Sequence, residues 1–407
     1  MFAHRHSLTR QRARTSTLSA LLMILIVGLM PSTSASASVP HVGHVFVIVL
    51  ENESSTSTFG DPSADPYLAS TLPSEGAFLP NFYATGHASN DNYISMVSGQ
   101  PANVLNQTDC VFYLNFLNIF VHRGMDEGAG CVYPRATQNI GTQLSAAGLT
   151  WTDYQQDMGN IPTRESAACG HPKLNARDYT QGAVSGDGYA ARHNPFVYFH
   201  DIIDYPAYCD AHVVALGGPF GSMPATALPG ERGLAADLTT VATTPNYSFI
   251  TPNLCEDGHD YPCKNQASGP SALADIDSFL ETWVPLITNS AAFRQDGLLE
   301  ITFDEADTSD ASACCGEVRG IGSPEPGIEG PGGGRIGTVL LSPFIAPGSR
   351  SATDYNHFSA LASFEDNFGL ARLGEAGFTT STFGTDVFTN PSGACVKGAT
   401  TPWVKCP

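Results

Sequence analysis

The sequence has few positive charges. Lys and Arg together number 19 among 407 residues, whereas Asp and Glu number 39, and the formal net charge is −20. A surface of this sign repels nucleic-acid phosphates and anionic membranes. We therefore expect no nucleic-acid partner, and an anionic ligand would need a local cation or a group of histidines to bind.

The sequence also lacks a long apolar run after residue 37, so we expect no stable insertion into a membrane. Residues 1–37 are typical of a Sec signal peptide, with four arginines before a short apolar run and an A-x-A cleavage site at Ala35–Ala37. This pattern predicts a secreted, extracellular protein whose mature chain begins near Ser38. The alternative is an uncleaved N-terminal anchor, but the apolar run is short for a membrane span.

Several motifs of known chemistry are absent. The sequence contains no G-x-S-x-G turn, no P-loop and no G-x-G-x-x-G with a following ribose-binding acid. No C-x-x-C pair occurs, which argues against a thiolate metal site. All ten cysteines follow residue 37, and an even number in an exported protein predicts disulfides. The plausible local pairs are Cys110–Cys131, Cys255–Cys263 and Cys395–Cys406, whereas the adjacent Cys314 and Cys315 are expected to bond to different partners.

Short apolar runs alternate with helical patterns along the mature chain. His44–Leu50 is almost entirely apolar and rich in β-branched residues, as in a strand buried on both faces. The alternation predicts an α/β fold, with a mostly parallel central sheet and helices on both faces. The expected strands are 44–50, 149–154, 247–250, 298–303 and 336–341, and the expected helices are 65–76, 138–147, 234–242, 271–288 and 356–370.

Residues 38–407 are expected to form a single domain with large loop insertions. Segments 100–140 and 158–230 are loop-rich, and we expect them to form a cap that sets specificity. Residues 371–407 are predicted to form a turn-rich tail.

Two pairs of residues with carboxylate or amide side chains follow expected strands. Glu51 and Asn52 come directly after the first strand, and Asp304 and Glu305 come directly after 298–303. The carboxyl ends of parallel strands meet at one edge of a sheet, where open α/β folds place their sites. Carboxylate and amide oxygens suit hard divalent cations. Either pair alone could be solvated loop charge, but the two together predict a metal site.

The stretch Thr85–Gly99 begins with small, polar residues and continues as a short helical pattern. This places Ser89 at or just before a helix N-terminus, where free N–H groups favour an anion. Ser89 is therefore a candidate nucleophile, with a helix cap as the alternative. Asn92 follows one turn later and could donate its amide to a bound anion, or could be a solvated residue of the first turn.

Three histidines stand in suggestive surroundings. His259 is flanked by Asp257 and Asp260, which could fix its tautomer and raise its pKa. His357 opens an expected helix, and His87 precedes Ser89 by two residues. His193 and His200 are considered only as residues behind such a site.

These segments together resemble the secreted phosphoesterase family of bacterial phospholipases C and acid phosphatases, a branch of the alkaline phosphatase superfamily. The matching motifs occur in the family's order and extend over residues 44–370. Relatives of the mycobacterial type usually have proline where this chain has Ala88 and Asp91. The motifs are Val47–Ser54, Thr85–Gly99, Thr251–Asp260, Ile301–Asp307 and Asn356–Ser359, with a weaker match at Arg192–Phe196.

The resemblance implies an alkaline-phosphatase-like fold and a divalent cation (Ca, Mg, Mn or Zn) bound by Glu51, Asn52, Ser89, Asp304 and Glu305. It implies that Ser89 is the nucleophile and that His259 and His357 hold the phosphoryl group or protonate the leaving oxygen. His87, Asn92 and Asp260 would bind substrate.

The expected activity is hydrolysis of a small phosphate ester through a phosphoserine intermediate. The first alternative is a phospholipase C-type phosphodiesterase that acts on a phospholipid headgroup. The second is a secreted binding protein that kept the fold without activity.

Overall fold

The structure is a computed structural model that describes residues 39–61, 64–219, 233–264, 267–317, 319, 322–323 and 325–404. The expected signal peptide lies outside these residues. Residues 38–407 form one compact unit. Among the described residues, no helix is long and apolar enough to span a membrane.

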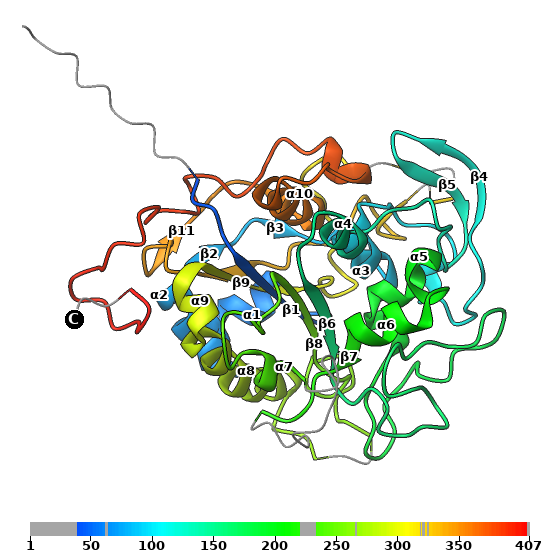
Figure 1. Cartoon of the computed structure of the whole chain (residues 1–407), viewed down its shortest axis with the longest axis horizontal. Coiled ribbons are helices and arrows are strands. Elements are labelled where there is room, and N and C mark those ends of the chain that lie inside the picture. Colours follow the sequence, from blue (N-terminus) through cyan, green and yellow to red (C-terminus); the bar gives the residue numbers. More distant parts are fainter. Residues whose placement is uncertain are drawn as a thin grey trace, which may run out of the picture. The chain divides into compact units, whose positions relative to one another are not determined.

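An eight-stranded sheet forms the centre of this unit (Figure 1). Its strands, in spatial order, are β11 (Ser349–Arg350), β2 (Ala77–Leu79), β10 (Thr338–Leu341), β9 (Gly297–Phe303), β1 (His44–Leu50), β8 (Tyr247–Thr251), β6 (Trp151–Gln155) and β7 (Val213–Ala215).

The sheet is mostly parallel, as the sequence predicted. β1 pairs in parallel with β8 and β9, and β6 pairs in parallel with β8 and β7. Within this described sheet, only β10 runs against its neighbours β9 and β2. All residues of β1 and β9 are buried, which explains why β1 is almost entirely apolar and why β9 is apolar apart from the buried Glu300 and Thr302.

Helices cover both faces of the sheet, which confirms the predicted α/β class (Figure 1). The longest, α8, shows the expected stripe, because Ile276, Phe279, Leu280 and Trp283 are buried on one side of it. One group comprises α3 (Ser89–Ser98), α4 (Ile140–Ala146) and α10 (His357–Phe368), and the other comprises η1 (Tyr67–Thr71), α8 (Ala272–Asn289) and α9 (Ala291–Asp296).

Shorter elements fill the connections. These are α1 (Ser55–Gly60), α2 (Leu72–Glu75), α5 (His200–Ile203), α6 (Pro206–His212), α7 (Leu234–Asp237), η2 (Asn106–Thr108), η3 (Ala191–His193), η4 (Pro195–Tyr198), η5 (Gly374–Gly377) and the paired strands β3 (Phe82–Tyr83) and β12 (Tyr355–Asn356).

Segment 100–140 is more ordered than expected. It contains an antiparallel hairpin of β4 (Leu117–His122) and β5 (Met125–Ala129). The sequence did not show it, because β4 lacks the polar alternation of a half-buried strand. The helix expected at 65–76 begins as the π-helical turn η1, and the one expected at 234–242 ends at Asp237.

The disulfides agree with two of the expected pairs. Cys110 bonds to Cys131 and Cys255 bonds to Cys263, while Cys169–Cys209 was not foreseen. Cys406, the expected partner of Cys395, lies outside the described residues. The expectation for Cys314 and Cys315 was wrong, because the backbone bends at both residues and the two bond to each other.

Glu365 in α10 provides a test of the buried core. Its Oε1 accepts a hydrogen bond from the Leu373 amide, while Oε2 is buried without a partner. Burial raises the pKa of Glu365 to about 9. In the unfolded chain Glu365 loses this proton at about pH 4.3. Between this pH and the folded-state pKa, the folded state therefore binds more protons than the unfolded state. Stability should therefore fall as pH rises through this range, by up to about 1.4 kcal/mol per pH unit.

We expect Glu365→Gln to be more stable than the wild type at pH 8 and about equally stable at pH 4, because the amide never ionises. Denaturant unfolding at both pH values measures this difference. Glu281→Gln, on the exposed side of α8, is the control and should follow the wild type. Equal destabilisation of Glu365→Gln at both pH values would contradict the assignment.

Candidate functional site

The site begins where two neighbouring parallel strands end together. Leu50 of β1 is in register with Phe303 of β9, so the next residues, Glu51 and Asp304, leave the sheet side by side. The Asp304 amide donates to the Leu50 carbonyl, and Asp304 Oδ1 accepts from the amides of Asn52 and Glu305. Asn52 has a φ of 61°, a conformation that asparagine tolerates better than most residues. The structure therefore brings together the four residues of the two predicted pairs.

These carboxylates lie in an environment that opposes negative charge. Glu51 and Asp304 are completely buried. Burial, and then the charges of Asp304 and Asp257, raise the pKa of Glu51 well above its usual value. Burial and the charge of Glu305 raise the pKa of Asp304 to about 8. Asp257, also fully buried, has a pKa raised by burial. Such a group calls for a compensating positive charge.

Ser89 is the first residue of α3 and faces this group. Its hydroxyl donates to Glu51 Oε2 at 2.8 Å, and Tyr93, one turn later, donates to Glu51 Oε1 at 2.8 Å. Ala88 precedes the helix with a φ of 142°, which L residues rarely adopt, and its amide donates to Glu305 Oε2. The predicted position of Ser89 at a helix N-terminus agrees with the structure, and its side chain is turned toward the acids.

His87 lies in the turn that precedes α3. Its Nδ1 is 2.9 Å from Glu305 Oε2 and its Nε2 is 2.9 Å from the Asp310 carbonyl. Burial alone would lower the pKa of His87, but the hydrogen bond to Glu305 and the charge of Glu305 outweigh it and raise the pKa. Both ring nitrogens are thus occupied by protein groups, so this geometry makes His87 a support for Glu305 rather than the predicted substrate contact.

Asn92 also differs from its predicted role. It is fully buried, and its Oδ1 accepts hydrogen bonds from the amides of Thr85 and Gly86 and from the Thr85 hydroxyl. Its Nδ2 donates to the carbonyls of Gly86 and Ala88. Since both amide hydrogens have protein acceptors, Asn92 holds the turn that precedes Ser89 and has no donor left for a bound anion.

His193, which the sequence placed only behind the site, lies directly beside two buried acids. Its Nε2 lies 3.3 Å from Glu51 Oε1 and its Nδ1 lies 3.2 Å from Asp257 Oδ2, and its ring stacks on Tyr93. Burial and the charge of Arg192 lower the pKa of His193 well below its usual value. Neither ring nitrogen of His193 has a hydrogen-bond partner of suitable geometry, so a neutral imidazole here keeps a nitrogen lone pair available to a cation. Its position in the short turn η3 gave no periodic signal.

His259 and Asp260 mark the more open side of the site, with about a quarter of each side chain exposed. Arg192 Nη2 donates to His259 Nε2 at 2.9 Å, so Nε2 accepts there and Nδ1–H donates to Asp260 Oδ1. Burial opposes the charge of Asp260, but the hydrogen bond from His259 prevails and lowers the pKa of Asp260. In this geometry Asp260 orients His259, in place of the predicted contact with substrate.

His357 is the first residue of α10 and is fully buried. Its Nε2–H donates to the Asp304 carbonyl at 2.7 Å. Burial lowers the pKa of His357 to about 4. The side chain is therefore neutral over most of the pH range, and it braces the backbone at Asp304. His200, 2.9 Å from Asn115 and 3.0 Å from Asp204, pairs with neither the acids nor Ser89.

The residues fit a divalent cation. Asp304 Oδ2 is buried without a hydrogen-bond partner, beside carboxylates that raise its pKa. Glu51, His193 and Asp257 each bring a ligand atom within 4.8 Å of the others. Oxygen donors with an imidazole suit Zn²⁺, and the oxygens alone suit Mg²⁺, Mn²⁺ or Ca²⁺.

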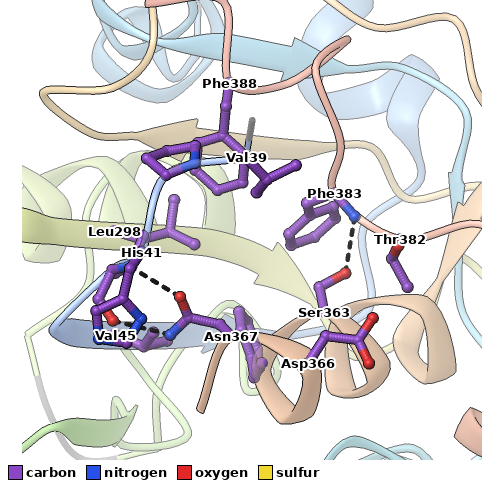
Figure 2. Close-up of a pocket in the computed structure, with 13 residues that line it drawn as sticks. Val39, His41, Val45, Leu298, Ser363, Asp366, Asn367, Thr382, Phe383 and Phe388 are labelled. Carbon is purple, nitrogen blue, oxygen red and sulfur yellow. Dashed lines mark hydrogen bonds between the residues drawn. The ribbon is translucent and has the colours of Figure 1, made fainter. Parts of the chain in front are cut away.

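One apolar cavity lies away from these residues. A cavity of about 340 Å³ lies at the opposite end of the strands, between the start of β1, the end of α10 and the C-terminal segment (Figure 2). Val45 and Leu298, near the starts of β1 and β9, line it, and Asn367 closes one side through two hydrogen bonds to Val42. None of the predicted site residues lines it, so the chemistry and this cavity are separate.

The role of Asn92 can be tested by Asn92→Asp, which keeps an acceptor but removes both donated hydrogen bonds. Two buried carbonyls then lose their donor, at about 1–3 kcal/mol each. We expect the melting temperature to fall by several degrees and kcat to fall with it. Asn81→Asp, which loses one exposed hydrogen bond to Ala352, is the control. A raised KM at unchanged melting temperature would instead indicate direct contact with substrate.

The sequence is similar to known phosphoesterases over most of its length. Residues 231–371 match the model of the Phosphoesterase family. The phosphatidylinositol-3-phosphatase of Mycobacterium tuberculosis is 25% identical over 368 residues, which cover 90% of this chain and 91% of that protein. The probable acid phosphatase of Kluyveromyces lactis is 25% identical over 334 residues, which cover 81% of this chain and 59% of that protein.

Solved structures with a related arrangement include a protein in the alkaline phosphatase superfamily from Vibrio parahaemolyticus. It superposes with a TM-score of 0.44 at 13% identity, covering 82% of this chain and 69% of that one. The lipoteichoic acid synthase LtaP from Listeria monocytogenes superposes with a TM-score of 0.46 at 12% identity, covering 86% and 77%.

The segment that matches the family includes His259, Asp304, Glu305 and His357, while Glu51 and Ser89 precede it. The family match and the relatives confirm the resemblance drawn from the motifs: this chain is related to the phosphoesterases, hydrolases that act on phosphoric ester bonds.

Proposed function

We propose that this protein is a secreted, metal-dependent phosphomonoesterase of the acid phosphatase type, which hydrolyses phosphate esters through a phosphoserine intermediate. One observation carries the proposal. The Ser89 hydroxyl, at the N-terminus of α3, donates to Glu51 within a group of buried carboxylates. A hydroxyl presented there has a proton acceptor beside it and helix N–H groups that favour an anion.

The proposed cation would be held by Glu51, Asn52, Ser89, Asp304 and Glu305, with His193 and Asp257 beside Glu51. When bound, it would neutralise the phosphate charge and lower the pKa of the Ser89 hydroxyl. The buried carboxylates, which raise one another's pKa values, support a cation at this position.

In the first step, Ser89 Oγ attacks phosphorus in line and its proton passes toward Glu51 Oε2. The bond from phosphorus to the leaving oxygen breaks, and Nε2 of His259 gives that oxygen a proton, which Nε2 carries only after the entering phosphate has taken over its hydrogen bond from Arg192. In the second step, water attacks the phosphoserine and gives a proton to His259. The bond from phosphorus to Ser89 Oγ breaks and Glu51 returns its proton to Oγ, which releases phosphate and restores the serine hydroxyl. Arg192, fully charged and next to His259, would hold a phosphate oxygen during both steps.

We assign the proton donor to His259 rather than His357 on geometric grounds. The Nε2–H of His357 is directed to the Asp304 carbonyl, and burial holds the pKa of His357 near about 4. His259 is partly exposed and is oriented by Asp260 through its other nitrogen. A phosphate ester that enters between Arg192 and His259 would accept a hydrogen bond from each.

The names of the relatives favour a monoesterase over a phospholipase C. The mycobacterial relative is named for the removal of a phosphate from an inositol lipid, and the yeast relative is named an acid phosphatase. The substrate is therefore proposed to be a phosphate monoester, either a small molecule or a phospholipid headgroup.

Ser89→Ala should lower kcat on p-nitrophenyl phosphate by at least about 10³-fold, since it removes the nucleophile. Burst kinetics and mass spectrometry of quenched wild-type enzyme should reveal phosphate on Ser89. Metal analysis of both proteins shows whether the variant keeps its cation. Near wild-type activity of Ser89→Ala would refute the mechanism. Wild-type turnover confined to phosphatidylcholine would favour the phospholipase C alternative, and bound metal without turnover of any ester would favour the binding protein.

The donor assignment predicts a dependence on the leaving group. His259→Gln should slow hydrolysis of alkyl phosphates at least tenfold more than that of p-nitrophenyl phosphate, because p-nitrophenolate leaves with little need of a proton. His357→Gln, the matched variant, should slow both substrates by the same factor, because it acts through the backbone at Asp304. The reverse pattern would assign the proton to His357.

A further inference from the structure

Exposed apolar side chains are concentrated on and just before β4, the outer strand of the β4–β5 hairpin, which lies at the edge of the unit (Figure 1). Five large hydrophobic residues between positions 112 and 121 are exposed, and Leu117, at 73%, is the most exposed of these. Monomeric proteins rarely expose a contiguous set of this kind without a use for it. The set, which we call the hairpin patch, comprises Phe112, Leu117, Ile119, Phe120 and Val121.

The patch is not confined to one face of the ribbon. In β4, Leu117, Ile119, Phe120 and Val121 are all exposed, although neighbouring residues of a strand point to opposite sides. A bulge between Asn118 and Phe120 shifts the register of β4 against β5. β5, by contrast, is buried from Met125 to Gly128. The outer strand therefore presents apolar side chains on both of its sides while the inner strand anchors it.

The hairpin is firmly attached to the domain. Gln100, just after α3, donates to the Gly124 carbonyl and accepts from the Asp126 amide. The Arg123 guanidinium stacks on the ring of Phe378 at 3.4 Å, and Cys110–Cys131 closes the loop that contains the hairpin. The patch is therefore held in place before any partner arrives.

The charge of the patch differs from that of the rest of the chain. Segment 111–125 contains no Asp or Glu, although the whole chain has a net charge of −20. The exposed charged or titratable residues of this segment are His122 and Arg123, at the turn. The acids of β5, Asp126 and Glu127, are buried. An apolar ribbon with a basic tip complements the phosphate layer and the acyl region of a lipid surface.

We propose that the β4–β5 hairpin docks this protein on a lipid surface, with the side chains of the hairpin patch in the interfacial region and Arg123 at the lipid phosphates. A second copy of this chain could pair with the free edge of β4, but it would leave the two apolar sides of the strand exposed. A lipid surface, in contrast, would cover the apolar side chains on both sides of β4. Among the described residues β4 pairs with β5 alone, so the backbone groups on its other edge have no partner strand. These groups need water, which restricts the ribbon to the hydrated interface of the lipid layer.

The negative charge of the whole chain determines which lipid headgroups the protein can approach. At −20 it is repelled by anionic lipid, whereas a zwitterionic surface offers phosphates without a net field. We therefore expect the protein to bind phosphatidylcholine vesicles, and to bind less as phosphatidylserine is added at low salt.

The test uses the mature protein and phosphatidylcholine vesicles in a flotation assay. The triple variant Leu117→Thr, Ile119→Thr and Val121→Thr keeps β propensity but removes apolar area. We expect its vesicle partition coefficient to fall at least tenfold, with turnover of soluble p-nitrophenyl phosphate within twofold of the wild type. Tyr205→Ser, at an exposed aromatic outside the patch, is the control and should bind vesicles like the wild type.

A second measurement avoids dependence on the folding of the triple variant. Ile119→Cys, labelled with an environment-sensitive fluorophore, should show a blue shift on addition of vesicles, whereas labelled Tyr205→Cys should not. Wild-type protein that does not float with vesicles, or a triple variant that floats equally well, would overturn the proposal. So would a wild-type dimer in light scattering that the triple variant loses while neither protein binds vesicles.

Discussion

The site depends on the parallel register of β1 and β9. Because Leu50 and Phe303 are paired, the chain must place Glu51 and Asp304 next to each other at the buried edge of the sheet. Two adjacent buried carboxyls repel, and the Asp257 carboxyl adds to this repulsion. The surrounding residues are arranged about that unfavourable charge. Arg192 is buried, with only 2% of its surface exposed. Its positive charge partly offsets the effects that raise the pKa values of Glu51 and Asp257.

The turn before α3 is held in place by the acids that follow β9. Glu305 accepts from the Ala88 amide and contacts His87, so the acid pair after β9 holds the segment that carries the serine. Asn92 then binds this turn to the first turn of its own helix. A small displacement of either support would move the Ser89 hydroxyl relative to Glu51, and the reaction proposed here depends on that distance. The position of the serine is thus a property of two loops and a helix together.

Much of this arrangement could be predicted from the sequence, for identifiable reasons. β1 and β9 are short apolar runs that end abruptly in acids, and a parallel sheet brings such ends to one edge. The position of His193 beside Glu51 and Asp257 could not be predicted, because it lies in a single short turn and reaches these acids only through the fold. The hydrogen bonds of Asn92 to its own turn could not be predicted, because spacing alone does not show whether an amide points to a ligand or to its own backbone. The Cys314–Cys315 bond depends on a local bend, and the hairpin depends on apolar residues that face outward, so neither left a periodic pattern.

Asp91 shows how a departure from the related motifs is accommodated. Its carboxyl is buried, with neither oxygen hydrogen-bonded to a partner, and it occupies the space that a Cβ on Gly86 would need. The glycine and the acid are therefore coupled, since any larger residue at position 86 would collide with the carboxyl. Burial, followed by the charges of Glu305 and Asp109, raises the pKa of Asp91 well above its usual value. The protein around Asp91 thus disfavours its charged form, so the extra acid beside Ser89 contributes less negative charge than its sequence position suggests.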